Sequence, residues 1–177
     1  MTDNFFRFWY SFGFVNFSQL EDGDVDGVYD YLVEPNLHEF ASFTFEDICL
    51  EFVKKLQKEN ALPFRYSKLG RWTGKTTLRD SQYPNGLRTA ETEIDILGIN
   101  SDANKYLVCE CKFKASKFNY TEYLNTLAKL APLKAKSEFY YFLFSESGFD
   151  DKIVEETSEN LRLYGLEEIV SHQSKSE

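Results

Sequence analysis

A strand-like stretch at residues 106–114, "YLVCECKFK", carries a carboxylate and an ammonium group two positions apart. Side chains two apart on a strand share a face, so Glu110 and Lys112 are expected to point the same way. Asp95 lies on the preceding strand-like stretch, "TEIDILGI", and hairpin pairing of the two stretches would bring it beside Glu110. The sequence therefore predicts two carboxylates and one ammonium group on one side of a sheet.

Two adjacent carboxylates repel each other and are costly to desolvate unless a divalent cation lies between them. Mg²⁺, or Mn²⁺ in its place, suits such a site because it takes a couple of carboxylates and fills its other positions with water and phosphate oxygens. A neighbouring lysine can hold an attacking water or offset charge in a phosphoryl-transfer transition state. A lysine that only forms an ion pair at a sheet edge explains the same residue types equally well.

The elements that must position these residues follow from hydrophobic periodicity. A helix is predicted from about residue 37 to residue 60, where Phe52 and Leu56 recur at helical spacing. Glu46 lies at the edge of this apolar stripe, two residues after Thr44, a possible cap. One interpretation of Glu46 is an acid near a helix start that favours the helix dipole, and the other is a functional acid.

The remaining elements complete an α/β pattern. Further predictions are a strand ending near residue 70, a long loop or extended hairpin over 73–90, strands at 92–99 and 106–114, a helix over 120–131, a strand over 138–145 and a helix over 150–165. The order predicts an α/β domain with a mixed sheet. Residues 1–36 are predicted to be an aromatic extension that packs on a domain over 37–170, and 171–177 a disordered tail.

Composition narrows the class of protein. Hydrophobic residues make up 42% of the 177 residues, which favours a folded globular chain, and no apolar run is long enough to span a bilayer. Three cysteines do not pair evenly, which favours a reducing, cytoplasmic setting, and the absence of a CxxC motif argues against zinc. The net charge is −9, but residues 63–118 carry +4 between acidic ends. A polyanion such as DNA would therefore be accepted only locally.

The motifs also resemble a known family. "FEDICLEF", "EIDILGI" and "VCECKFK" are similar to the PD-(D/E)XK nuclease superfamily, which has a helix glutamate, an Asp on one strand and (D/E)xK on the next. More narrowly, "DNFFRFWYSF", "FEDICLEF", "LGRW", "EIDILG" and "ECKF", in this order over residues 3 to about 145, resemble the uncharacterised C-terminal domain of prokaryotic AAA+-type ATPases.

The resemblance implies a restriction-endonuclease-like fold, with a mixed central sheet flanked by helices. It also implies a role for each residue that matches the motif. Asp95 and Glu110 are then metal ligands, together with the backbone carbonyl of Cys111. Lys112 is the catalytic lysine, and Glu46 is a helix acid that assists the metal or its waters. "EID" replaces the Pro-Asp of the signature, a position that varies widely.

Other implications concern substrate and partners. The segment 73–90 looks like an insertion and contributes Lys75, Arg79 and Arg88 as candidate phosphate contacts. Relatives are usually attached to an AAA+-type ATPase and a winged helix, so the chain is expected to be a piece of a longer protein. The first hypothesis is a metal-dependent nuclease acting on DNA. The alternatives are a catalytically inactive DNA-binding or regulatory module of an ATPase, and a homodimer formed through the aromatic N-terminus.

Overall fold

The computed structural model describes residues 3–79, 87–130, 136–156 and 158–173. The chain divides into two compact units, Met1–Phe45 and Glu46–Glu177, so the division falls inside one long helix. The described helices and strands are α1 (Asn4–Phe8), η1 (Trp9–Gly13), η2 (Phe14–Asn16), α2 (Phe17–Glu21), α3 (Val25–Val28), η3 (Tyr29–Val33), α4 (Glu34–Lys58), β1 (Lys68–Arg79), β2 (Leu87–Ile99), β3 (Lys105–Lys112), α5 (Tyr120–Ala128), β4 (Glu138–Ser145), α6 (Asp151–Val154), β5 (Leu161–Gly165) and α7 (Leu166–Gln173).

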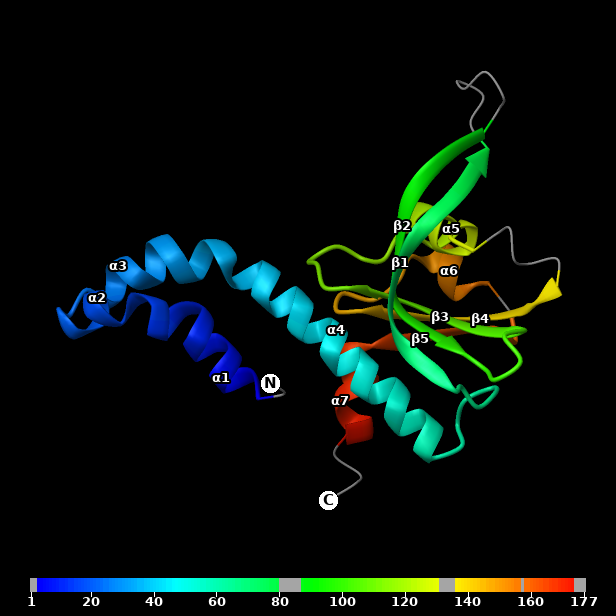
Figure 1. Cartoon of the computed structure of the whole chain (residues 1–177), viewed down its shortest axis with the longest axis horizontal. Helices are drawn as coiled ribbons and strands as arrows, with labels where there is room; N and C mark the ends of the chain where they lie inside the picture. Colours follow the sequence, from blue (N-terminus) through cyan, green and yellow to red (C-terminus); the bar gives the residue numbers. More distant parts are fainter. Residues whose placement is uncertain (1–2, 80–86, 131–135, 157, 174–177) are drawn as a thin grey trace. The chain divides into compact units, whose positions relative to one another are not determined.

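The second unit is built on a five-stranded mixed sheet with the order β1-β2-β3-β4-β5 (Figure 1). The pairings of β1 with β2 and of β2 with β3 are antiparallel, whereas those of β3 with β4 and of β4 with β5 are parallel. Parallel neighbours need crossover connections, and these contain α5 and α6. The α/β class and the mixed sheet predicted from the sequence are confirmed, and the described residues of the segment 73–90, which are 73–79 and 87–90, form two paired strands of an extended hairpin.

The helix predicted over 150–165 is wrong. Among the described residues of that range, only Asp151–Val154 is helical, and Leu161–Gly165 instead forms β5 beside β4. The ring of Tyr164 stacks on Phe144 with centroids 5.3 Å apart, so pairing and packing in the sheet override the helical periodicity. Helix α7 then runs to Gln173, which places helix at the start of the predicted tail; residues 174–177 lie outside the described part.

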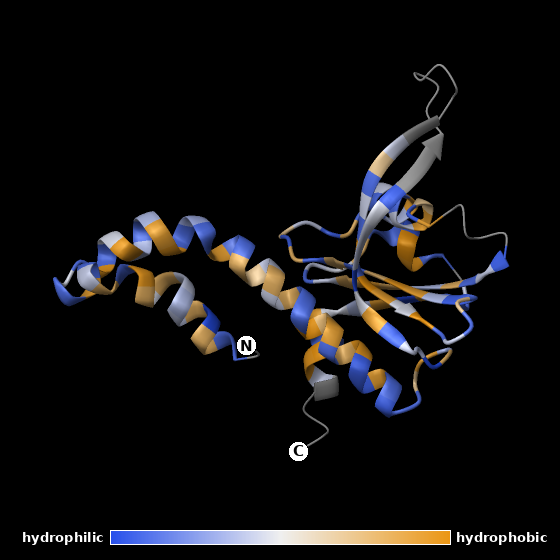
Figure 2. Cartoon of the chain, in the orientation of Figure 1, coloured by the Kyte–Doolittle hydropathy of each residue, from blue (hydrophilic) through white to orange (hydrophobic). Residues whose placement is uncertain are grey.

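One face of the sheet packs against the second half of α4. Phe52 of α4 lies edge-on to Phe144 and Tyr164, with ring centroids 5.9 and 4.9 Å apart. Cys49 of α4 and Cys109 of β3 are both fully buried on this side. Apolar and polar residues alternate along α4 and the strands (Figure 2), as expected for elements with one buried face.

The opposite face packs against α5 and α6. Two clusters of buried residues form there: Ile94, Leu97, Val108, Leu130, Phe139 and Tyr141 in one, and Phe118, Tyr123, Leu143, Phe149 and Ile153 in the other. Helix α5 begins with a capping box, in which Asn119 and Glu122 each accept the other's backbone N–H. This cap fixes where α5 starts and hence which of its side chains reach the sheet.

The first unit is helical and exposes many aromatic side chains. Its core consists of Phe12, Val28 and Val33, with Leu20 and Phe40 packed against them. The exposed large apolar residues of this unit are Phe5, Phe6, Phe8, Trp9, Tyr10, Phe14, Val15, Phe17, Val25, Tyr29, Tyr31, Leu37 and Phe43. The expected packing of this segment on the sheet domain stays a prediction. Within the described residues, no helix is both long and apolar enough to cross a membrane.

Candidate metal centre

The pairing between β2 and β3 ends just before the first predicted metal ligand. The last pair of this antiparallel ladder is Ile96 opposite Cys109, and β2 continues beyond it as the partner of β1. Asp95 is the next residue of β2, and its Oδ2 accepts the backbone N–H of Cys111 at 2.7 Å. The side chain of Asp95 thus takes the place of a ladder carbonyl, which holds this carboxylate beside β3.

Glu110 and Lys112 lie on the same face of β3, as their spacing predicts. Nζ of Lys112 is 2.7 Å from Oε1 of Glu110, and Glu110 is only 5% exposed. The other oxygen of Glu110, Oε2, accepts a hydrogen bond from the ammonium group of Lys129, which caps the C-terminal end of α5. One nearly buried carboxylate therefore holds two lysines, each on a different oxygen.

These residues share one pocket of about 380 Å³. Its lining is Glu91, Thr92, Glu93, Asp95, Glu110, Lys112, Asn125, Ala128 and Lys129. The two walls are β2 on one side and α5 on the other, with β3 between them. Four carboxylates and two ammonium groups give the lining a net charge of −2. This balance favours a small cation over an anion as the first species to enter.

Burial and charge shift the pKa of the central groups. Burial raises the pKa of Asp95, and the negative charge of Glu110 raises it further, whereas the N–H of Cys111 lowers it. Burial alone would lower the pKa of Lys112, but the carboxylate of Glu110 outweighs this and raises it. Lys112 is therefore an ammonium group at neutral pH, so it can donate hydrogen bonds and supply positive charge but cannot accept a proton.

The cysteines on either side of Glu110 belong to the core. Burial raises the pKa of Cys109 and Cys111 well above the usual value, so both are thiols rather than thiolates and are poor metal ligands. Cys111 reaches the site through its backbone instead. In an antiparallel strand the N–H and C=O of one residue leave on the same side, so the carbonyl of Cys111 faces the side of β2 that holds Asp95.

Glu46 is not among the residues that line the pocket. Helix α4 begins at Glu34, so Glu46 lies in the helix interior, and the interpretation of Glu46 as an acid at a helix start is wrong. Thr44, the expected cap, instead donates its hydroxyl to the carbonyl four residues earlier. The carboxylate of Glu46 pairs with Arg71 of β1, which also lies 3.4 Å from Glu93. Arg71 thus connects Glu46 to the rim of the pocket, because Glu93 lines it.

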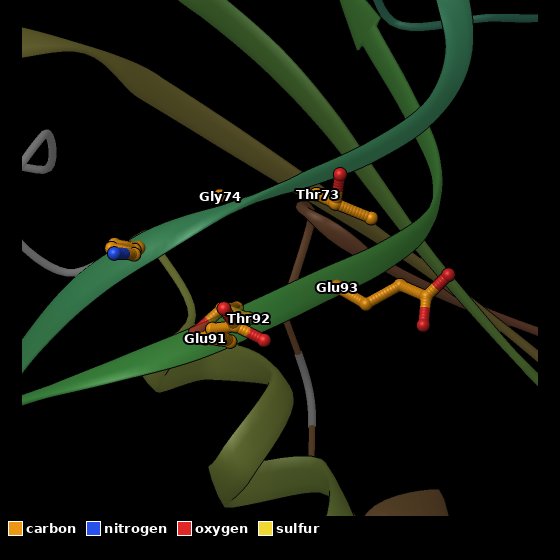
Figure 3. Close-up of a pocket in the computed structure, with 6 residues that line it drawn as sticks. Thr73, Gly74, Glu91, Thr92 and Glu93 are labelled. Atoms are coloured by element: carbon orange, nitrogen blue, oxygen red, sulfur yellow. The ribbon is translucent and has the colours of Figure 1, made fainter.

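A second pocket of about 430 Å³ lies on the β1–β2 hairpin (Figure 3). It is lined by Thr73, Gly74, Lys75, Glu91, Thr92 and Glu93, and the last three residues also line the first pocket. Lys75, a predicted phosphate contact, is exposed and lies opposite Glu91 in the ladder. The side chains of Arg79 and Arg88 lie outside the described residues, so phosphate contacts from this hairpin remain a prediction.

The oxygen atoms at this pocket decide which metal ion it could bind. Within the described part of the chain, no group of three or more His, Cys, Asp or Glu residues is arranged to hold a metal. The pocket offers two inner carboxylates, those of Asp95 and Glu110, beside a backbone carbonyl. Zn²⁺ would need more nitrogen or sulfur ligands, whereas Mg²⁺ is commonly held by one or two carboxylates plus waters and phosphate oxygens. The residues present therefore fit Mg²⁺ or Mn²⁺ and not a closed structural site.

Comparison with known proteins shows the family of this chain. The profile of a family described as archaeal and bacterial proteins of unknown function matches residues 9–124, which include Glu46, Asp95, Glu110 and Lys112. The chain belongs to this family. An uncharacterised protein of Methanocaldococcus jannaschii is 30% identical over 119 residues, which are 66% of this chain and 23% of that protein. The chain thus spans about a quarter of the length of that relative.

Among solved structures, the crystal structure of a protein of unknown function is similar to part of this chain. It has a TM-score of 0.40 and 15% sequence identity, and the match covers 73% of this chain and 67% of the other.

Sequence reasoning missed Lys129 and Arg71. Both belong to elements that were predicted, but each acts through a contact between elements that are distant in the sequence. Lys129 lies nineteen positions from Glu110, and Arg71 lies twenty-five from Glu46. The signal that could have indicated Lys129 is a lone cation at the end of an otherwise apolar helical stripe next to a predicted acid pair.

Proposed function

We propose that this family member is a metal-dependent nuclease domain of the PD-(D/E)XK type, with a restriction-endonuclease-like fold, that hydrolyses DNA phosphodiester bonds. The observation that supports this function most is that Asp95, Glu110 and Lys112 line a single pocket. Burial raises the pKa of the half-buried Asp95, and the like charge of the nearly buried Glu110 raises it further. A dication would relieve that repulsion, which gives the pair a chemical use.

Each side chain has a role in this proposal. Asp95, Glu110 and the carbonyl of Cys111 would hold Mg²⁺, which when bound supplies positive charge to a phosphate oxygen and to a bound water. Lys112, as an ammonium group, orients the attacking water and offsets negative charge at phosphorus. Hydrolysis forms a bond from the water oxygen to phosphorus, and the attacking water releases a proton to solvent. The bond from phosphorus to one sugar oxygen breaks, and this oxygen receives a proton from solvent. Glu46 acts indirectly, because it holds Arg71 beside Glu93.

The test is metal-dependent nicking of supercoiled plasmid by the wild type and by Asp95→Asn. We expect Mg²⁺ or Mn²⁺ to support nicking by the wild type, and Asp95→Asn to reduce the rate at least a hundredfold, because a metal ligand is lost. Asp102→Asn is the matched control, since Asp102 lies in the exposed turn between β2 and β3. Equal nicking by wild type and Asp95→Asn would show that the nuclease proposal is wrong.

A second candidate function is a DNA-binding or regulatory module without hydrolysis. The ion pairs of Glu110 with both Lys112 and Lys129 favour it, since they satisfy this acid without any metal. The overall charge of −9 also disfavours tight binding of nucleic acid by the chain alone. Metal binding in calorimetry without nicking would favour this function, particularly if DNA binding required another protein.

Partners are part of the same proposal. The first unit exposes Phe5, Tyr31 and other aromatic side chains, and such residues are typical of surfaces that contact another protein. We propose that AAA+-type ATPase and winged-helix domains, in the same polypeptide or in another, cover this surface. The greater length of the Methanocaldococcus relative is compatible with additional domains. A stable dimer of the isolated chain in light scattering would favour the homodimer instead.

A further inference from the structure

Two ammonium groups contact Glu110, although the proposed mechanism uses only one lysine. Lys112 occupies its Oε1 at 2.7 Å, and Lys129 occupies its Oε2. The two lysines differ in origin, because Lys112 lies on the same strand as Glu110 and Lys129 comes from the end of α5. Their exposures are similar, with 30% of the Lys112 side chain and 19% of the Lys129 side chain open to solvent.

The inner charges are balanced as the chain stands. Asp95 and Glu110 supply two negative charges, and Lys112 and Lys129 supply two positive charges within the same pocket. Both oxygens of Glu110 already hold an ammonium group, and a dication added to these four groups would leave them with two excess positive charges, which the exposed Glu91 and Glu93 offset only weakly. A cation that binds between Asp95 and Glu110 must therefore displace an ammonium group or be accompanied by an anion.

Lys129 is the lysine that can leave. Lys112 is kept beside Glu110 by its position two residues away on a strand, where both side chains project from the same face. Lys129 has its Cα on another element, and its flexible four-carbon stem can place the ammonium group elsewhere along the α5 wall. That wall also contributes Asn125 and Ala128 to the lining of the pocket.

We propose that Lys129 is a displaceable counter-ion that becomes a phosphate-binding group. Before the metal binds, its ammonium group neutralises Glu110. When a divalent cation takes Oε2 of Glu110, Lys129 turns to a non-bridging oxygen of the substrate phosphate, so metal and phosphate enter as a nearly neutral pair. The inference rests on the proposed metal-dependent function, and it assigns to α5 the positioning of the substrate phosphate.

The experiment compares wild type, Lys129→Met and the control Lys117→Met by calorimetry. Lys117 pairs with Asp151 on the surface, so its replacement removes the same charge away from the pocket. Lys129→Met is expected to bind Mn²⁺ roughly tenfold more tightly than wild type, since the competing charge is gone. With Mg²⁺ saturating, it should bind inorganic phosphate roughly tenfold more weakly. Lys117→Met should leave both affinities unchanged.

The two readouts separate this role from a structural one. A lysine that only stabilised Glu110 would, on removal, disturb the pocket and weaken metal binding rather than strengthen it. Lys129→Gln repeats the measurements with a polar side chain, and thermal unfolding reports whether each variant is folded. The expected result is tighter metal binding by folded Lys129→Met and Lys129→Gln than by wild type.

Failure of this inference differs from failure of the proposed function. If wild type binds Mn²⁺ and folded Lys129→Met and Lys129→Gln bind it no more tightly, Lys129 does not compete with the metal, and only the inference is overturned. Unchanged phosphate affinity in the variants overturns the phosphate-binding role. If wild type and both variants bind no metal at all, the metal-dependent function and the inference are overturned together.

Discussion

The two faces of β3 place different demands on one short strand. Towards α4 it presents Cys109 and Cys111, which are uncharged thiols buried near Cys49. Towards α5 it presents Glu110 and Lys112, which are charged and line a pocket. The first face contributes to stability through close packing. The second face is costly to desolvate, so each of its charged groups needs a partner of opposite charge. Substitutions on the two faces should therefore separate stability from binding.

The largest expected effect on stability lies on the α4 side of the sheet. Phe144 of β4 is fully buried, with Phe52 and Tyr164 packed against its ring. Phe144→Ala should lower the free energy of unfolding by about 3–5 kcal/mol, because it leaves a cavity. Urea unfolding measures this, with Leu124→Ala at an exposed position of α5 as a control that should lose under about 0.5 kcal/mol. A loss at Phe144 as small as that of the control would contradict the assignment of the core to this face.

The second prediction concerns the charged face. Glu110→Gln should weaken Mn²⁺ binding more than about tenfold, since a ligand is lost. The free energy of unfolding should fall by only about 1–2 kcal/mol, because Lys112 and Lys129 are both partly exposed and can turn to water. Calorimetry and urea unfolding on the same preparation give both quantities. If Glu110→Gln kept full metal affinity but lost as much stability as Phe144→Ala, Glu110 would contribute to stability and not to metal binding.

The smallest effect is expected at the cap of the helix that carries Lys129. Burial alone would raise the pKa of Glu122, but hydrogen bonds from Lys114 and from the N–H of Asn119 outweigh it and lower the pKa. A lowered pKa means that the folded state binds the proton less tightly than the unfolded state, so the stabilisation is complete well above the ordinary value of 4.5 and is lost as pH falls through the lowered pKa.

Glu122→Gln keeps the geometry of the capping box and removes only the charge. It should reduce the free energy of unfolding by about 0.5 kcal/mol at pH 7, and the difference from wild type should be smaller at pH 3. Urea unfolding at the two pH values tests this. A difference that persisted at the lower pH would mean that the carboxylate acts through packing rather than through charge.

The local sequence pattern was sufficient to predict how the acids and the lysine of β2 and β3 lie, but not which residues from other elements contact the site. Alternation along a strand predicts that Glu110 and Lys112 share a face, and the short turn predicts the hairpin that brings Asp95 near. The partner of Glu46 could not be predicted in this way, because Arg71 reaches it across two elements separated by an irregular segment. Strand β5 was missed because its five half-buried residues pair with β4, a contact that has no local signature.

A turn at the far end of the β2–β3 hairpin determines whether the acid pair exists at all. The side chain of Asn100 accepts the backbone N–H groups of Asn104 and Lys105 at 3.0 and 2.9 Å, and Ala103 adopts a φ of 52° to close the loop. Adding or deleting one residue there would shift the two strands by one position and turn one carboxylate to the opposite face. The length of this loop is therefore under the same constraint as the acids themselves, although none of its residues lines the pocket. Homologues or engineered variants in which the length of 100–104 changes should lose the site even when every ligand residue is retained.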